Sequence, residues 1–264
     1  MIRKPTTFRY KLTLEYDGKN FSGWQKQKDA RTVQGDLLKG AMRVFGEDAE
    51  IDIQGCGRTD AGVHALEYIA HLQVASELEP FVVEQMLNDT LPKDIAVIAV
   101  ELVDPRFHAR HSCVARSYIY QLRSRKSAFG KRYSWWVREE LDIAAMQRAA
   151  ALMEGMHDFA AFAEKKEMKK STKVLVYKVD VVEEQGGAVR IRVIGSHFLW
   201  HMVRRMVGVL VEAGCHRLTE ETIRGLCRGS ASEIPSHHTA PAAGLFFEKA
   251  CYDKELLDDF IRSS

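Results

Sequence analysis

The stretch "GCGRTDAGVHA", from Gly55 to Ala65, combines three glycines with an arginine and an aspartate two residues apart. Glycine is costly inside a helix or strand, and it is useful where the backbone turns tightly or approaches a ligand. This spacing therefore predicts a shaped loop rather than a regular element. The residues IDIQ (51–54) before the loop and residues 67–74 after it have the composition of strands, so we expect the loop to join two strands.

The pair Arg58 and Asp60 is the chemically active part of this loop. A carboxyl group in a partly dry pocket has a raised pKa, and an adjacent guanidinium offsets that rise and keeps the group ionised. A carboxylate held in this way can attack an electrophilic carbon and form a covalent intermediate. The alternative is an Asx-turn in which Asp60 only caps its own loop.

Other loop chemistries do not match the spacing. A dinucleotide-binding fingerprint needs a third glycine where Asp60 stands. The sequence contains no GxxxxGK[ST], no HExxH and no EF-hand series. His108 and His111 are three residues apart, but no cysteine or carboxylate set completes a metal site beside them. No metal is therefore expected.

The apolar periodicity predicts a mixture of strands and helices. Leu12, Leu14 and Tyr16 share one face of a strand at 11–16, and Thr32 can cap a helix with apolar residues every four positions up to Phe45. Further strands are predicted at 95–103, 118–120, 174–182, 189–193 and 246–252, and further helices at 83–91, 143–153 and 198–213. Mixed elements with hairpin-like spacing predict an α+β fold around an antiparallel sheet.

The length of 264 residues allows one large domain or two of ordinary size. Asp104-Pro105 is the best candidate boundary, which gives an N-terminal domain at 1–105 with the aspartate loop and a C-terminal domain at 106–264. Five cysteines without a CxxC pair favour reduced thiols. The N-terminus lacks the apolar core of a secretory signal, and no stretch has the ~18 uninterrupted apolar residues of a membrane span. We therefore expect a soluble, cytoplasmic protein.

The net charge is only +2, but positive charge is concentrated locally. Residues 106–137 contain eight Lys or Arg and no Asp or Glu, with seven aromatic residues interleaved. A second basic run follows at 165–173. Positive side chains can follow a phosphate backbone, and aromatic rings can stack on bases. A nucleic-acid partner and an ordinary solvated face are equally compatible with the charge pattern alone.

Six motifs in order resemble the TruA family of tRNA pseudouridine synthases. GCGRTDAGVHA is similar to the family signature GRTDxGVHA. The other matching motifs are YDGKNFSGWQKQ (16–27) with TVQG (32–35), FHARHSCVARSYIY (107–120), GMHDFAAF (155–162), FLWHMVRRMVG (198–208) and APAAGLFF (240–247). The matches extend over nearly the whole chain.

The resemblance implies a pseudouridine synthase fold, in which two similar α/β domains share an extended antiparallel sheet with a cleft between them. It implies isomerisation of uridine to pseudouridine in tRNA, usually at positions 38–40 of the anticodon arm. It further implies that no metal or organic cofactor takes part, and that the protein is a homodimer.

The resemblance also implies roles for particular residues. Asp60 matches the invariant catalytic aspartate, which acts as a nucleophile on the uracil or on the ribose, or as a base at the ribose. Arg58 matches the arginine that helps to extrude the target nucleotide from its stack. Tyr118 matches the tyrosine that stacks on the target base, Arg204 the arginine that pairs with the catalytic carboxylate, and Leu245 an apolar residue that lines the uracil pocket.

Arg106 and Arg110, in and next to the FHAR block, are the candidate tRNA-binding residues outside that set. The segment 163–179 departs from the family pattern, so the choice of uridine stays open. Three other functions remain possible at this point: a pseudouridine synthase for other tRNA positions or another RNA, a catalytically idle RNA-binding protein, and a metal-dependent hydrolase.

Overall fold

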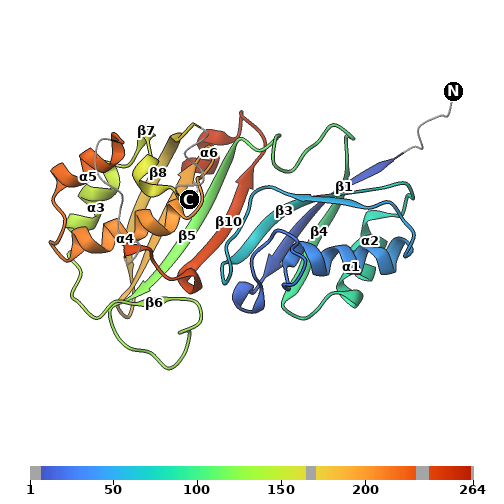
Figure 1. Cartoon of the computed structure of the whole chain (residues 1–264), viewed down its shortest axis with the longest axis horizontal. Helices are drawn as coiled ribbons and strands as arrows, with labels where there is room; N and C mark the ends of the chain where they lie inside the picture. Colours follow the sequence, from blue (N-terminus) through green and yellow to red (C-terminus); the bar gives the residue numbers. More distant parts are fainter. Residues whose placement is uncertain (1–6, 165–170, 230–237, 263–264) are drawn as a thin grey trace. The chain divides into compact units, whose positions relative to one another are not determined.

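The computed structural model describes residues 7–164, 171–229 and 238–262. The chain divides into two compact units (Figure 1). The first contains Met1–Cys113 and Phe247–Tyr252, and the second contains Val114–Phe246 and Asp253–Ser264. Whether residues 1–105 and 106–264 are independently folding domains stays a prediction. The α+β class is confirmed, because both units combine helices with strands.

The first unit is built on the strands β1 (Phe8–Tyr16), β2 (Asp52–Gly55), β3 (His64–Val74) and β4 (Ile95–Val103). β1 lies between β3 and β4, and β2 pairs with β3; all three pairings are antiparallel. Alternate residues of β1 are buried, as its period-two pattern predicts. The helices α1 (Val33–Phe45) and α2 (Pro80–Thr90) pack against one another beside these strands (Figure 1).

Helix α1 forms where its cap and its apolar spacing predict. The Thr32 side chain accepts a hydrogen bond from the Gly35 N–H at 3.2 Å, and Val33, Leu37 and Ala41 are fully buried. Helix α2 begins at Pro80, earlier than the predicted residue 83. Proline is favoured in the first turn of a helix because its missing N–H would have no partner there.

The second unit is built on β5 (Ala115–Arg123), β7 (Gly155–Asp158), β8 (Lys173–Glu184) and β9 (Ala188–Gly195). They pair antiparallel in the order β5-β9-β8-β7. A two-residue strand, β6 (Trp135–Trp136), adds a parallel pairing to β5. β10 (Leu245–Cys251) contributes its first two residues to this unit and the others to the first unit.

The helices of the second unit are α3 (Ile143–Ala151), α4 (Met202–Gly214), α5 (Glu220–Cys227) and α6 (Leu257–Arg262). α3 packs against β8, and α4 and α5 pack against α3. The prediction that a helix begins at Phe198 was wrong. His201 has φ of 63°, a left-handed conformation that a right-handed helix cannot include, so α4 begins at Met202.

Within the described residues, no helix is both long and apolar enough to span a membrane. None of the five cysteines forms a disulfide.

Candidate active site

The loop with Arg58 and Asp60 joins β2 to β3, as its glycines and flanking strands predict. Arg58 is exposed, Thr59 is buried and Asp60 is half-buried. This alternation leaves the aspartate accessible while its neighbour anchors the backbone.

The segment Tyr16–Gln25 forms hydrogen bonds to this loop. The Tyr16 hydroxyl lies 2.9 Å from the Thr59 hydroxyl, and the Trp24 N–H donates to the Thr59 carbonyl at 3.1 Å. On the other side of Asp60, the Gly62 N–H donates to the Phe21 carbonyl at 3.3 Å. The backbone is thus fixed both before and after the aspartate, which orients a reacting group before its substrate arrives.

Two glycines make this close approach possible. A Cβ at Gly18 would stand 1.9 Å from the Val63 carbonyl oxygen, and one at Gly23 would stand 2.5 Å from the Thr59 carbonyl oxygen. Gly23 also has φ of +92°, which other residues rarely adopt. Gly18 of YDG and Gly23 of SGW must therefore be glycine, because another stretch of backbone occupies the space that a side chain would need.

Two aromatic residues lie beneath the beginning of the loop. Tyr68 and Trp24 are almost fully buried, with ring centroids 4.3 Å apart. The Tyr68 hydroxyl donates to the Gly57 carbonyl. A Cβ at Gly55 would stand 2.0 Å from the Tyr68 hydroxyl oxygen and 2.6 Å from the Trp24 ring. Gly55 therefore lets the chain run directly over these rings.

His64, at the start of β3, completes the support. Its Nδ1 accepts a hydrogen bond from the Gly18 N–H at 3.1 Å and lies 3.0 Å from a carboxylate oxygen of Asp17. Tyr16, Trp24 and His64 lie in sequence motifs, but no role was predicted for them. Their signal was present as aromatic and histidine residues near glycines, but their partners are 35 to 47 residues away in sequence.

The other predicted catalytic residues and Leu245, predicted to line the uracil pocket, belong to the second unit. Tyr118 is a buried residue of β5, and its ring lies edge-on to that of Phe198 with centroids 5.2 Å apart. Arg204 is in the first turn of α4, and its Nε donates to the Ala240 carbonyl at 2.7 Å. Leu245, 4 % exposed, is the first residue of β10. The structure thus places Arg58 and Asp60 on one loop and these three residues on three elements of the second unit.

The segment before Leu245 is tightly held within the second unit. The Ala240 N–H donates to the Arg204 carbonyl at 3.1 Å, and the Tyr120 hydroxyl donates to the Pro241 carbonyl at 2.8 Å. Burial raises the pKa of Tyr120 far above its usual value, so its hydroxyl stays a donor. A Cβ at Gly208 would stand 1.5 Å from the His238 carbonyl oxygen, so α4 needs glycine there to accept this segment.

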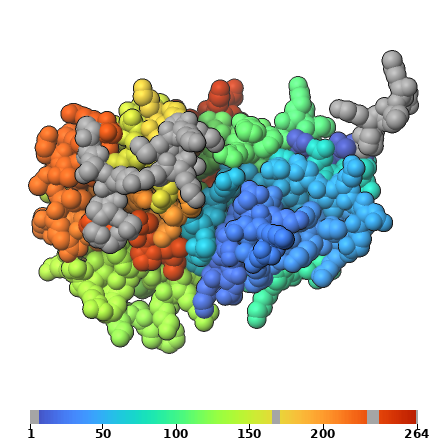
Figure 2. Space-filling view, viewed as in Figure 1, coloured from blue at the N-terminus to red at the C-terminus, as the bar shows by residue number. Residues whose placement is uncertain are grey.

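Most basic side chains of the segment 106–137 are exposed, but Arg116 is buried in β5. The Arg106 side chain is 91 % exposed and forms an ion pair of 2.9 Å with Asp104, which lowers the pKa of Asp104 to about 2. Arg110 is also exposed. The loop before β6, drawn light green, lies on the surface in Figure 2, and the side chain of its Phe129 projects into solvent. Most of the second basic run, residues 165–170, lies outside the described residues.

Among the residues that the structure describes, no group of three His, Cys, Asp or Glu side chains is arranged to hold a metal ion. The residues predicted for the uridine site are a carboxylate, two guanidinium groups, a phenol and an apolar side chain.

The family comparison favours the pseudouridine synthase among these functions. Residues 13–112 and 149–253 match the model of a family described as tRNA pseudouridine synthase. The chain belongs to this family. It is therefore an isomerase, and the expectation from its motifs is confirmed.

Curated relatives agree. The chain is 40% identical over 242 residues to tRNA pseudouridine synthase A 2 of Bacillus cereus, which covers 90% of this chain and 97% of that protein. It is 37% identical to tRNA pseudouridine synthase A of Ruminiclostridium cellulolyticum, over 92% of this chain and 99% of that protein. The corresponding protein of Thermodesulfovibrio yellowstonii is 36% identical over 92% of this chain.

Proposed function

We propose that the chain converts uridine to pseudouridine at positions 38–40 of the tRNA anticodon arm, with Asp60 as the catalytic carboxylate. The observation that carries this proposal is the family motif at Gly55–Ala65, whose aspartate is half-buried on a loop fixed on both sides. The family and the relatives support tRNA as the substrate.

The reaction exchanges one bond of the nucleoside for another. The bond between the ribose and a uracil nitrogen breaks, the base turns, and a uracil carbon bonds to the ribose. That carbon then loses its proton and the freed nitrogen gains one, so that the product is an isomer of the substrate. Asp60 acts either as a nucleophile on the uracil or the ribose, or as a base at the ribose. A carboxylate on a fixed loop suits each of these roles, because a nucleophile or base must be held at the reacting atom.

The remaining residues act around this carboxylate in the proposal. Arg58 occupies the gap left when the target nucleotide leaves its stack, which fits its exposed position next to a buried threonine. Tyr118 stacks on the target base, Leu245 lines the uracil pocket and Arg204 pairs with the carboxylate. Arg106 and Arg110 contact tRNA phosphates.

The proposal includes a homodimer, a cytoplasmic location and a reaction without metal or organic cofactor. Size-exclusion chromatography with light scattering tests the dimer, since a monomer of 30.0 kDa and a dimer differ twofold in mass.

The central experiment is pseudouridine mapping of bulk tRNA incubated with the pure protein in EDTA. The matched control for Asp60→Asn is Asp89→Asn, the same change on an exposed residue of α2. We expect pseudouridine at positions 38–40 with the wild type and with Asp89→Asn. For Asp60→Asn we expect a turnover at least ~10³-fold lower, which corresponds to about 4 kcal/mol of barrier, with nearly unchanged tRNA binding.

Other results would change the proposal in specific ways. Pseudouridine at other tRNA positions would keep the reaction and move the site, which the divergent segment 163–179 would then explain. No pseudouridine with tRNA still bound would favour an idle RNA-binding protein, and a reaction abolished by EDTA would show that a metal takes part.

A further inference from the structure

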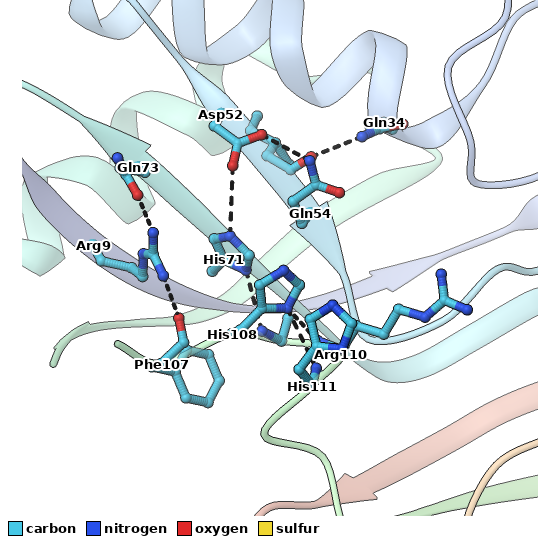
Figure 3. A network of polar contacts seen from close by, with 12 residues as sticks. Arg9, Gln34, Asp52, Gln54, His71, Gln73, Phe107, His108, Arg110 and His111 are labelled. Carbon is cyan, nitrogen blue, oxygen red and sulfur yellow. Dashed lines mark hydrogen bonds and ion pairs between the residues drawn. The ribbon is translucent and has the colours of Figure 1, made fainter. Parts of the chain in front are cut away.

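A buried histidine of the first unit, on the strand that follows the aspartate loop, contacts the segment with Arg110 (Figure 3). His71 lies in the middle of β3, between Lys11 of β1 and Gln54 of β2, and is 1 % exposed. Burying a polar ring without hydrogen bonds is costly, so its partners decide what it does there.

One of these partners is the backbone of the segment Phe107–Ser112. The Ala109 N–H donates to Nδ1 of His71 at 3.1 Å, and Ala109 is fully buried. On the other side of the ring, Nε2 lies 3.8 Å from a carboxylate oxygen of Asp52. The ring therefore links β2 and β3 to a segment more than thirty residues later in the chain.

The segment itself is wound around a second histidine. Nδ1 of His108 accepts from the Arg110 N–H at 3.1 Å and from the His111 N–H at 3.3 Å. The His108 ring stacks edge-on against His71, with centroids 4.7 Å apart. This turn is a rigid unit, because its own N–H groups are hydrogen bonded within it.

A second hydrogen bond, to Phe107, holds the start of the segment Phe107–Ser112. Arg9 of β1 donates from one guanidinium nitrogen to the Phe107 carbonyl at 2.6 Å and from another to the Gln73 side chain. The segment is thus anchored at Phe107 and at Ala109, and Arg110 follows the second anchor directly.

The hydrogen bond from Ala109 fixes the tautomer of His71. Because Nδ1 accepts, the proton of the neutral ring is on Nε2, toward Asp52. Burial, together with the charges of Arg9 and His108 and against the opposing effect of Asp52, lowers the pKa of His71 to about 4. The ring is therefore neutral near pH 7 and keeps its acceptor, which a protonated ring would lose.

We propose that His71 is a positioning residue for tRNA binding: its Nδ1 holds Ala109 so that the exposed Arg110 meets a tRNA phosphate in a fixed place. This inference rests on the proposed tRNA function. His71 touches no substrate; it acts through the backbone of the segment. An anchored arginine loses less conformational freedom on binding than a mobile one, so the anchor contributes to affinity rather than to the chemical step.

The test compares two variants of the full chain, His71→Asn and His71→Gln, in which the imidazole is replaced by a side-chain amide. In His71→Asn the side-chain oxygen can take the place of Nδ1, whereas in His71→Gln the longer side chain places its oxygen near Nε2. Both keep a polar side chain at the site, so they differ mainly in the hydrogen bond to Ala109.

We expect His71→Gln to raise KM for tRNA about tenfold with kcat nearly unchanged, and to lower the slope of log binding constant against log salt by about one unit. His71→Asn should restore both values. Equal effects of the two variants, or a loss confined to kcat, would overturn the proposal.

Two measurements on the tRNA-free protein keep this test separate from the function itself. Nitrogen chemical shifts of the wild type should show the Nε2–H tautomer, and the Ala109 amide should exchange faster in His71→Gln than in His71→Asn. An Nδ1–H tautomer, or an unprotected Ala109 amide in the wild type, would refute the anchor. If the anchor is present but the wild type forms no pseudouridine, the proposed function fails instead.

Discussion

Replacing Gly18 by alanine tests whether the aspartate loop depends on its packing against the Tyr16–Gln25 segment. The new Cβ would stand 1.9 Å from the Val63 carbonyl oxygen, whereas real Cβ contacts are essentially never shorter than 3.0 Å. The two backbones must therefore separate by roughly 1.1 Å, which is the difference of these distances. No side-chain rotation relieves this contact, since the obstacle is a carbonyl group.

The separation would reach Asp60, the proposed catalytic residue. Val63 donates its N–H to the Asp60 carbonyl at 3.2 Å, and the Gly18 N–H is bound to His64. A displacement of ~1 Å at a reacting group can lower the rate ~100-fold. Overpacking of this kind typically costs about 1–3 kcal/mol of unfolding free energy. We therefore expect Gly18→Ala to lower kcat/KM for tRNA by about two orders of magnitude and to be less stable by that amount.

The assay is the initial rate of pseudouridine formation, together with urea denaturation of the same preparation. Gly46→Ala is the control, because Gly46 has φ of +109° at the end of α1 with nothing within 4 Å of its missing Cβ. It should lose stability through backbone strain and keep its activity. A Gly18→Ala protein with a rate within threefold of the wild type would refute the reasoning, as would an equal loss of activity in Gly46→Ala.

Three further predictions follow from individual contacts. Tyr68→Phe removes the donor to the Gly57 carbonyl and should lower the unfolding free energy by about 0.5–1.5 kcal/mol in urea, whereas unchanged stability would mean that this bond contributes nothing. His71 becomes protonated near pH 6.5 in the unfolded chain but only near pH 4 in the folded chain. The unfolding free energy should therefore fall by up to about 3 kcal/mol as the pH drops from 6.5 to 4, and His71→Asn should lack this loss. Identical acid-unfolding curves for the wild type and His71→Asn would contradict this prediction. Arg106→Glu with Arg110→Glu should weaken tRNA binding most at low salt and reduce the salt slope by about two units, and an unchanged slope would exclude both residues as phosphate contacts.

The elements that local patterns specify were predicted well. Strand β4 has the predicted bounds of 95–103, and α1 follows its Thr32 cap because cap and apolar spacing agree. Helix α5 was not predicted, although Thr219 caps it and its buried Ile223 and Leu226 have helical spacing. β6 was also missed, because a two-residue strand has no period of its own and exists only through its pairing with β5.

The start of α4 shows where local pattern was misleading. The apolar residues continue from Phe198 into the helix, so periodicity alone extends it to that residue. The left-handed His201 interrupts it, and the side chain of this residue lies 3.0 Å from Glu164, which is 37 positions earlier in the chain. A contact of that range leaves no local pattern in the sequence.

The site divides in the same way. The sequence by itself determined the Arg58–Asp60 loop, because glycine spacing and the charged pair are local features, and it determined the family through ordered motifs. It did not show why Gly18 and Gly23 must be glycine, or that Tyr68 and Trp24 support the loop from below. Only the tertiary structure decided why these residues are needed. Segments distant in the chain approach each other so closely at these positions that a single added methyl group would clash.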